Sequence, residues 1–396
     1  MEISKLSKLI TPSGTMAISN KARILREQGK PVIGFGAGEP DFPTPEYVVK
    51  DVQVAAEDTS NHKYSPVAGL TILKEEIVRT SQLYSGINVQ QENILVSNGG
   101  KHAILTTFMS ILNPGDEVLI PSPYWTTYPE AVKISGGNPI IVDTEFDDDF
   151  KVNTDQLDAL KTSKTKILVW VSPSNPTGVV YTKEEAEKIY NWAFENNVWI
   201  LSDELYEHLV YEGMTSPSPA QYDTELNNTI IINGVAKAYS MTGWRVGWII
   251  ANTDVIDMAK KIQSHATSNV SNISQIAAYS ALKNGLNETK IMKESFNRRR
   301  LYAIEEFSNI ENVNLIKSTG AFYLFPDVSY YSGNGVINGV HNSIDFCNWL
   351  LDEYFIAFVP GEVFGKNGFL RCSYALSDDD LHEGLSRFSK AIKEIQ

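Results

Sequence analysis

One lysine lies among small, apolar and aromatic residues in the segment INGVAKAYSMTGWRVG, residues 232–247. Lys237 loses hydration in such surroundings, and Arg245, eight residues later, disfavours a second positive charge nearby. Both effects lower the pKa of an amine, which turns it into a nucleophile able to form a Schiff base. The alternative is an ordinary surface lysine, for which polar neighbours would be expected.

A glycine turn joins a predicted strand to a predicted helix. The strand NILVSN ends in Gly99-Gly100-Lys101, and the helix KHAILTTFMSIL follows at once. Such a turn presents free backbone N–H groups and the positive end of the helix dipole to an anion, so a phosphate would fit there. A plain turn with a solvated lysine is the alternative.

Polar residues follow two other predicted strands and interrupt a third. Asp203 is the first carboxylate after the buried strand VWILS, where it could serve catalysis or cap a helix. Asn175 lies between two prolines in SPSNPTG, which holds its amide in a rigid turn. Arg371 lies inside the apolar strand FLRCSY and needs an anionic partner, either a substrate carboxylate or a structural salt bridge.

Two further patterns indicate chemistry that we do not favour. The glycines of residues 34–38 suggest a dinucleotide-binding turn, but Pro40, Pro43 and Pro45 occupy the place where its helix should begin. Glu204 and His208 are spaced to share one helical face and bind a metal, but no third ligand is evident. We therefore expect no bound dinucleotide and no metal.

The elements that must position these residues form an α/β fold. From residue 93, short apolar strands alternate with longer helices, which predicts a mainly parallel sheet covered by helices on both faces. Ligands of such sheets lie beyond the carboxyl ends of the strands. After about residue 290 the pattern changes to a smaller α+β lobe. We expect a large domain over 46–288 and a small domain built from 1–45 and 289–396.

Composition narrows the function classes. The 396 residues include 34 basic and 48 acidic ones, a net charge of −14, which disfavours nucleic acid as a partner. The first residues lack the apolar run of a signal peptide, and no stretch resembles a membrane helix. Cys347 and Cys372 are the only cysteines, too few for a disulfide framework. We expect a cytoplasmic enzyme.

Together these motifs resemble the class I pyridoxal 5′-phosphate-dependent aminotransferases of fold type I, and within them the bacterial aspartate aminotransferases that use a lysine for the distal carboxylate. The likeness extends from PSGT at residues 12–15 to RCSYA at residues 371–375. Each motif is modest alone, but their order and spacing are specific. The resemblance implies pyridoxal phosphate as cofactor and a homodimer whose active sites lie at the interface.

The resemblance also implies residue roles around the cofactor. Lys237 resembles the lysine that binds it covalently, Asp203 the partner of the pyridine nitrogen, and Tyr206 the phenol at the ring hydroxyl. The remaining cofactor-binding positions match at Gly99, Gly100, Lys101 and Arg245 for the phosphate, Trp125 and Asn175 at the ring, and Tyr64 for the phosphate of the neighbouring subunit.

For the substrate, Arg371 resembles the arginine that pairs with the α-carboxylate, with Gly38, Trp125 and Asn175 beside it. The residues expected at the side-chain carboxylate are Lys101, Ser13 and Thr15. The sequence departs from the family pattern at Gly234 and Ala236, where other branches carry phosphate-binding hydroxyls, and at His102, where close relatives often have glutamine.

The expected reaction moves the amino group of L-aspartate to 2-oxoglutarate, giving oxaloacetate and L-glutamate by ping-pong kinetics. An aromatic amino acid or prephenate aminotransferase of the same fold is the alternative. A cofactor-binding regulator without catalysis belongs to a different class, and it would need a DNA-binding face that this acidic chain does not offer.

Overall fold

A seven-stranded sheet forms the centre of the larger part of the molecule. The computed structural model describes residues 2–12, 14–333 and 335–395, excluding the side chains of residues 15–17. The strands, in their order across the sheet, are β2 (Ile94–Ser97), β8 (Gly247–Ile250), β7 (Thr229–Gly234), β6 (Trp199–Asp203), β5 (Thr165–Val171), β3 (Glu117–Ser122) and β4 (Asn138–Asp143). Only β8 runs antiparallel to its neighbours, so the prediction of a mainly parallel sheet is confirmed.

Successive residues of each strand face opposite sides of the sheet, as the period of two requires. In β7, Ile230 and Ile232 pack with the helices on one face, whereas Ile231 packs on the other. The helices that cover the large sheet are α3 (Glu46–Glu57), α4 (Thr71–Thr80), α5 (Gly100–Ile111), α6 (Thr127–Ile134), α7 (Thr154–Leu160), α8 (Lys183–Glu195), α9 (Thr253–Ala266) and α10 (Asn272–Asn284). Both faces are therefore covered by helices, with apolar layers between them.

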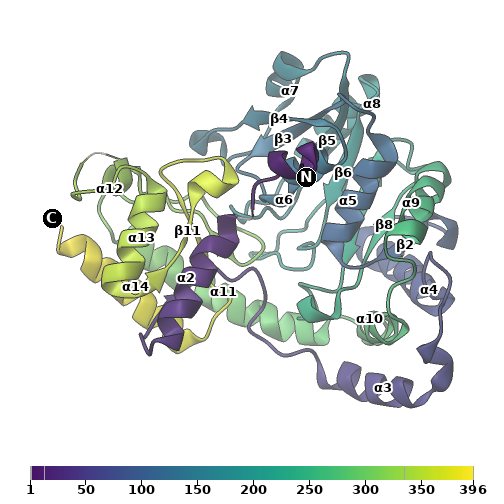
Figure 1. The fold of residues 1–396 in the computed structure, drawn as a ribbon, viewed down its shortest axis with the longest axis horizontal. Coiled ribbons are helices and arrows are strands. Elements are labelled where there is room, and N and C mark those ends of the chain that lie inside the picture. The colour runs from purple at the N-terminus through teal and green to yellow at the C-terminus, as the bar shows by residue number, and fades with distance from the viewer. Residues whose placement is uncertain (1, 13, 334, 396) are drawn as a thin grey trace.

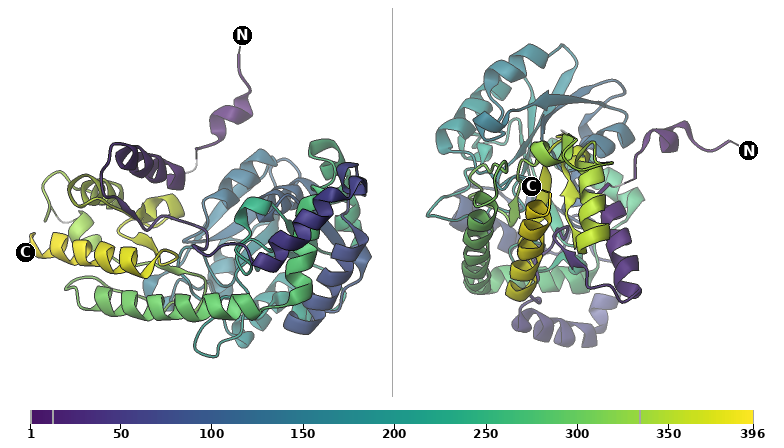
Figure 2. Two further views of the ribbon diagram at one scale, coloured as in Figure 1. Left: turned by 90° about the horizontal axis from the view of Figure 1, so that it is seen from below. Right: turned by 90° about the vertical axis from the view of Figure 1, so that its left-hand side faces the viewer.

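Residues from both ends of the chain build a second core beside the sheet. Its elements are α2 (Gly14–Glu27), β1 (Ile33–Gly34), α11 (Asn287–Ser308), β9 (Tyr323–Leu324), α12 (Ser329–Gly333), α13 (Ser343–Tyr354), β10 (Ile356–Ala357), β11 (Val359–Pro360), β12 (Leu370–Ser373) and α14 (Asp378–Lys393). They group at the left of Figure 1, and the large sheet fills the right. Figure 2 shows the long helix α11 running beneath both groups.

The strands of the two small sheets, β1-β10 and β11-β12-β9, are shorter than the sequence predicts. The apolar run IAFVP reads as one strand, but it divides into β10, which pairs in parallel with β1, and β11, which pairs antiparallel with β12. Phe358 lies between the two and is fully buried. The run changes partners at this point, and periodicity alone does not indicate such a change.

The shorter elements are α1 (Lys5–Leu9), a π turn at Ser81–Ser85, and single 3₁₀ turns at Thr59–His62, Gln91–Asn93, Phe146–Asp148, Pro219–Tyr222, Thr242–Trp244 and Gly361–Phe364. In the part of the chain that the structure describes, no helix is both long and apolar enough to cross a membrane.

Candidate active site

Strands β2, β6 and β7 deliver the predicted site residues to one edge of the sheet. Asp203 is the last residue of β6 and lies in register with Ile232 of β7. Strand β7 ends at Gly234, three residues before Lys237, and β2 ends two residues before Gly99. Because these strands run in the same direction, their carboxyl ends meet, as the sequence predicts.

Lys237 is held between the loop 35–42 and an aromatic pair. Its Nζ donates a hydrogen bond to the carbonyl oxygen of Gly38, and it lies 5.7 Å from the ring centre of Tyr206 and 5.9 Å from that of Phe322. Burial lowers the pKa of Lys237 to about 8, an effect that the charge of Glu39 opposes. The amine is therefore far easier to deprotonate than an exposed lysine.

Asp203 is a buried carboxylate held by two donors. The Tyr128 hydroxyl donates to its Oδ2 at 2.7 Å, and the backbone N–H of Leu205 donates to its Oδ1 at 3.3 Å. Burial raises the pKa of Asp203 to about 6, although both hydrogen bonds and the nearby charge of Lys237 lower it. The carboxylate is thus ionised at neutral pH and available to a cationic partner.

The turn at Gly99 forms a cradle beside an arginine. Gly99 has a φ of +81° and caps α5, whose first N–H groups have no acceptor within the helix. A Cβ at Gly99 would lie 2.7 Å from Nη2 of Arg245. The Arg245 guanidinium donates to the carbonyl oxygen of Thr242 at 2.9 Å and pairs with no described carboxylate. Backbone N–H groups and a guanidinium thus surround a position suited to an anion.

Arg371 is a buried cation without a carboxylate partner. It is 2% exposed, and its guanidinium donates to Oδ1 of Asn175 and to the carbonyl oxygen of Gly36, each at 2.9 Å. Its Nε has no hydrogen-bond partner among the described residues. The structural salt bridge that the sequence left open is therefore not formed within the described chain, and a planar donor pair remains available to a carboxylate.

Aromatic rings lie against the charged side chains of the site. The Tyr206 and Tyr323 hydroxyls are 2.8 Å apart, and the Arg371 guanidinium lies 4.6 Å from the ring centre of Tyr323. Lys101 Nζ lies 5.0 Å from the ring centre of Trp125. Burial, helped by the charge of Arg245, lowers the pKa of Lys101.

One predicted residue, Tyr64, lies at the exposed surface, and the side chains of two others are not described by the structure. Tyr64 is 91% exposed. Ser13 lies outside the described residues, and Thr15 is described only as part of the backbone of α2.

His102 accepts the Asn98 N–H through Nδ1 at 3.3 Å, so it supports the turn at Gly99 in its neutral form.

Glu204 and His208 do not share a helical face, because residues 205–208 form a turn. Glu204 accepts from Ser202 and Ser218, and the imidazole of His208 lies 3.4 Å from Glu207. Among the described residues, no group of three or more His, Cys, Asp or Glu side chains could hold a metal ion.

Sequence reasoning missed two residues of the site. Tyr128 lies in α6, three positions after Trp125, and the two rings pack edge to face at 5.5 Å. Its closeness in the sequence to Trp125, a predicted site residue, is the signal that could have found it. Tyr323 lies in the apolar run AFYLFP, where nothing in the pattern separates it from core residues.

The geometry agrees with comparisons to known proteins. Residues 30–388 match the family described as aminotransferase class I and II. The aspartate aminotransferase of Streptomyces avermitilis is 46% identical over 98% of this chain and 95% of its own length. The probable aspartate/prephenate aminotransferase of Aquifex aeolicus is 40% identical over 99% of this chain and 98% of its own length.

Solved structures show the same fold. The aspartate aminotransferase of Rhizobium meliloti superposes with a TM-score of 0.94, at 35% identity and 99% coverage of both chains. The Thermus thermophilus aspartate aminotransferase with maleate gives 0.92, at 35% identity over 98% of this chain and 99% of that one. These matches extend over both the large sheet and the terminal elements. The chain is a member of the class I and II aminotransferases, with the fold of the fold type I enzymes.

Proposed function

We propose that the protein transfers the amino group of L-aspartate to 2-oxoglutarate, using pyridoxal phosphate and giving oxaloacetate and L-glutamate. The observation that carries this proposal is Arg371, a buried guanidinium whose described partners are neutral and whose Nε is unpaired. Such a group fits the α-carboxylate that all these substrates share. The relatives named as aspartate aminotransferases support the choice of amino acid.

The residues at the sheet edge fit the cofactor. The cradle at Gly99, with the N–H groups of Gly100 and Lys101 and the guanidinium of Arg245, suits a phosphate. Asp203 suits a protonated ring nitrogen, and Lys237 is an amine that can bind the aldehyde. The remaining groups that we assign to the ring are Tyr206, Asn175 and Trp125. Gly234 and Ala236 add no hydroxyl to the phosphate site.

The chain's residues divide the catalytic work. When bound, pyridoxal phosphate supplies an electron sink for the electron pair left at the substrate Cα. Lys237 then removes the proton from Cα, which its lowered pKa permits near neutral pH. Arg371 and Asn175 hold the α-carboxylate and so orient the Cα–H bond. Asp203 holds the proton on the ring nitrogen.

For the distal carboxylate we propose Lys101, together with Ser13 and Thr15. Lys101 lies over Trp125 at 5.0 Å without an ion pair among the described residues, so its charge is available to a dicarboxylate. The same stacking also leaves an aromatic surface in the pocket. Aromatic amino acids or prephenate therefore remain the second candidate substrates, supported by the Aquifex aeolicus relative's name.

The substrate assignment has a direct spectroscopic test. Adding aspartate or glutamate to the purified, cofactor-loaded protein is expected to convert the bound cofactor from its aldehyde-derived form to its amine form. An unchanged absorption spectrum with both acids overturns the proposed substrate pair. Comparing kcat/KM for aspartate, phenylalanine and prephenate separates the two candidate functions.

The pH dependence of cofactor capture tests the state of Lys237. Below a pKa of about 8 the ammonium form predominates and cannot attack. The rate at which the cofactor-free protein binds pyridoxal phosphate covalently is expected to rise tenfold per pH unit up to about pH 8 and then level off. An N-acetyllysine amide measured in parallel is the reference, since its amine titrates near 10.4. A protein rate that still rises at pH 10 contradicts the prediction.

Tyr128 is expected to set the acidic limit of activity. Its hydroxyl stabilises ionised Asp203, so Tyr128→Phe should raise the pKa of that carboxyl. The acid limb of kcat/KM for aspartate should move up by roughly one pH unit, the effect of one hydrogen bond to a charged group. Glu204 and Lys237, the ionisable neighbours of Asp203, are unchanged in this variant.

Tyr181→Phe is the matched control for this variant, because Tyr181 is also buried, but its hydroxyl accepts the backbone N–H of Val152, whereas that of Tyr128 donates to the Asp203 carboxylate. It should leave the acid limb where it is. A Tyr128→Phe enzyme with lower kcat and an unmoved acid limb would assign Tyr128 to packing alone.

We further infer a homodimer, a division of the chain into domains 46–288 and 1–45 plus 289–396, and a cytoplasmic location. The exposed ring of Tyr64 supports the dimer, and the separate core built from both chain ends supports the division. The two cysteines, buried and unpaired, suit a reducing compartment. Light scattering of the active enzyme tests the dimer, and a fully active monomer contradicts it.

A further inference from the structure

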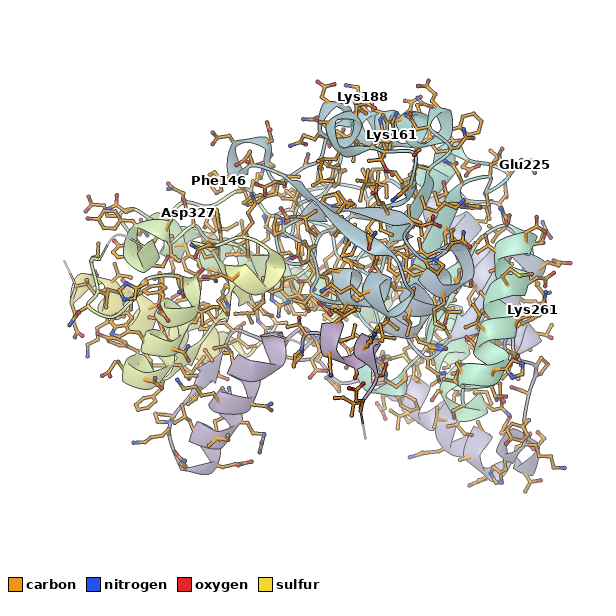
Figure 3. The ribbon with its side chains drawn as sticks, turned by 45° about the horizontal axis from the view of Figure 1, so that its top comes forward. Phe146, Lys161, Lys188, Glu225, Lys261 and Asp327 are labelled. Atoms are coloured by element: carbon orange, nitrogen blue, oxygen red, sulfur yellow. The ribbon has the colours of Figure 1, made fainter. Side chains whose placement is uncertain are left out.

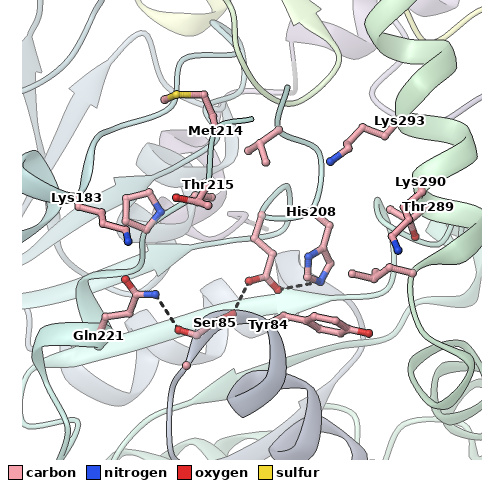
Figure 4. Close-up of a pocket in the computed structure, with 16 residues that line it drawn as sticks. Tyr84, Ser85, Lys183, His208, Met214, Thr215, Gln221, Thr289, Lys290 and Lys293 are labelled. Atoms are coloured by element: carbon pink, nitrogen blue, oxygen red, sulfur yellow. Dashed lines mark hydrogen bonds and ion pairs between the residues drawn. The ribbon is translucent and has the colours of Figure 1, made fainter. Parts of the chain in front are cut away.

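A cavity of about 460 Å³ lies apart from the site described above. It is bounded by the π turn Ser81–Ser85, the loop that follows Tyr206, the start of α8 and the first turns of α11 (Figure 4). Neither Lys237 nor Arg371 lines it. Its volume is in the range of sites for small molecules.

Three lysines from two helices line this cavity. Lys183 lies at one side in Figure 4, and Lys290 and Lys293 lie at the other, with the Lys293 amine turned towards the middle. None of the three forms an ion pair in the described ranges of the chain. Three positive charges thus border a shared space, and none of them is paired with a carboxylate of the described chain.

Glu207 is the one carboxylate among the described lining residues, and it is held by neighbouring side chains. Glu207 accepts from Nδ2 of Asn233 at 2.6 Å and from Oγ of Ser85 at 2.8 Å, and the imidazole of His208 lies 3.4 Å from it. Three lysines against Glu207 give the lysines and the carboxylate together a formal charge of about +2. The cavity is therefore complementary to two negative charges.

Two helices begin at this cavity. Helix α8 starts at Lys183, and α11 starts at Asn287, just before the lining residue Thr289. The positive ends of both helix dipoles favour an anion there. The first-turn carboxylates are Glu184, Glu185 and Glu288, and none of them lines the cavity. Glu185 pairs with Lys151, and Glu184 lies close enough to Lys183 for their charges to interact. Lysine charge and helix ends therefore act in the same direction.

We propose that this cavity is a second, non-catalytic binding site for a compact dianion, either a phosphate group or a dicarboxylate. The proposal does not depend on the substrate of the active site. It requires that the amines at its rim supply most of the affinity.

Calorimetric titration of the cofactor-loaded enzyme tests the proposal, with inorganic phosphate in one arm and malonate in the other. The Lys290→Gln/Lys293→Gln double variant is compared with Lys188→Gln/Lys261→Gln, which removes the same charge from exposed lysines elsewhere (Figure 3). We expect the dissociation constant of at least one probe to rise tenfold or more in the first variant and to stay within twofold in the control. Malonate bound at the active site is unaffected by either variant and is fitted as a separate site.

The arm that responds identifies the ligand class: phosphate alone, dicarboxylate alone, or any compact dianion. Binding that is equal in both variants, or absent from the wild-type enzyme in both arms, overturns the proposal. Melting temperature and activity with aspartate should match between the variants, since neither carries a change in the catalytic group. If the double variant does not fold, Lys183→Gln is titrated in its place under the same criteria.

Discussion

A Lys237→Ala enzyme is expected to lose at least about a thousandfold in kcat, because it loses both the amine that binds the cofactor and the base that removes the Cα proton. The structure places this amine at the Gly38 carbonyl, beside the Tyr206 and Phe322 rings. No other described amine occupies that position, so no substitute base is at hand. Single-turnover kinetics with aspartate measure the loss without requiring the cofactor to be released.

Two further variants separate the amine's chemistry from its charge. Lys237→Arg keeps a positive charge that stays protonated at any working pH, so it should be as inactive as the alanine variant. Lys188→Ala removes an exposed lysine from α8 and should keep full activity. Substantial turnover in either Lys237 variant would show that another group moves the proton, and the assignment of this lysine would be wrong.

Much of the large sheet could be predicted from the sequence, because its strands are nearly continuous apolar runs bounded by turn residues. The run TIIING became β7 and VWILS became β6 with almost no change of boundary. The same logic placed Asp203 and Lys237 at one edge, since parallel strands carry their carboxyl ends together. In the large sheet, the strands expected from the apolar runs are therefore the strands that the parallel topology requires.

The small lobe was less predictable because its strands are short and take partners from distant segments. Strand β1, of two residues, pairs with β10 more than three hundred residues later. No periodicity can develop over two residues, so the sequence indicates neither the strand nor its partner.

In the site, charged residues within apolar runs and Asn175 were predictable, whereas Tyr128 and Tyr323, which contact the charged residues, were not. Arg371 is conspicuous in an apolar strand, but its contact with Tyr323 depends on the antiparallel pairing of β12 with β9. The basic cavity is a similar case. Lys183 and Lys290 are ordinary in sequence, and only the packing of α8 and α11 around one loop brings them together.

Asp203→Asn is expected to lower kcat by about a hundredfold to several thousandfold. The carboxylate is buried, and it is the partner that we assign to the protonated ring nitrogen of the cofactor. Removing one member of a buried ion pair costs about 3–5 kcal/mol. Because the electron sink depends on that proton, most of the loss should appear in the chemical step rather than in substrate binding. Single-turnover rates and KM for aspartate, measured together, show this division.

Glu204→Gln is the matched control, since Glu204 is the adjacent buried carboxyl. Burial and the nearby charge of Glu207 raise the pKa of Glu204 to about 8, so it is largely neutral at pH 7. The amide keeps an oxygen for the Ser202 and Ser218 hydroxyls and changes little charge. Glu204→Gln should therefore retain kcat within a few-fold. If both variants lost activity equally, the effect would come from disturbing this buried segment, and the ionised state of Asp203 would not be the source of the rate.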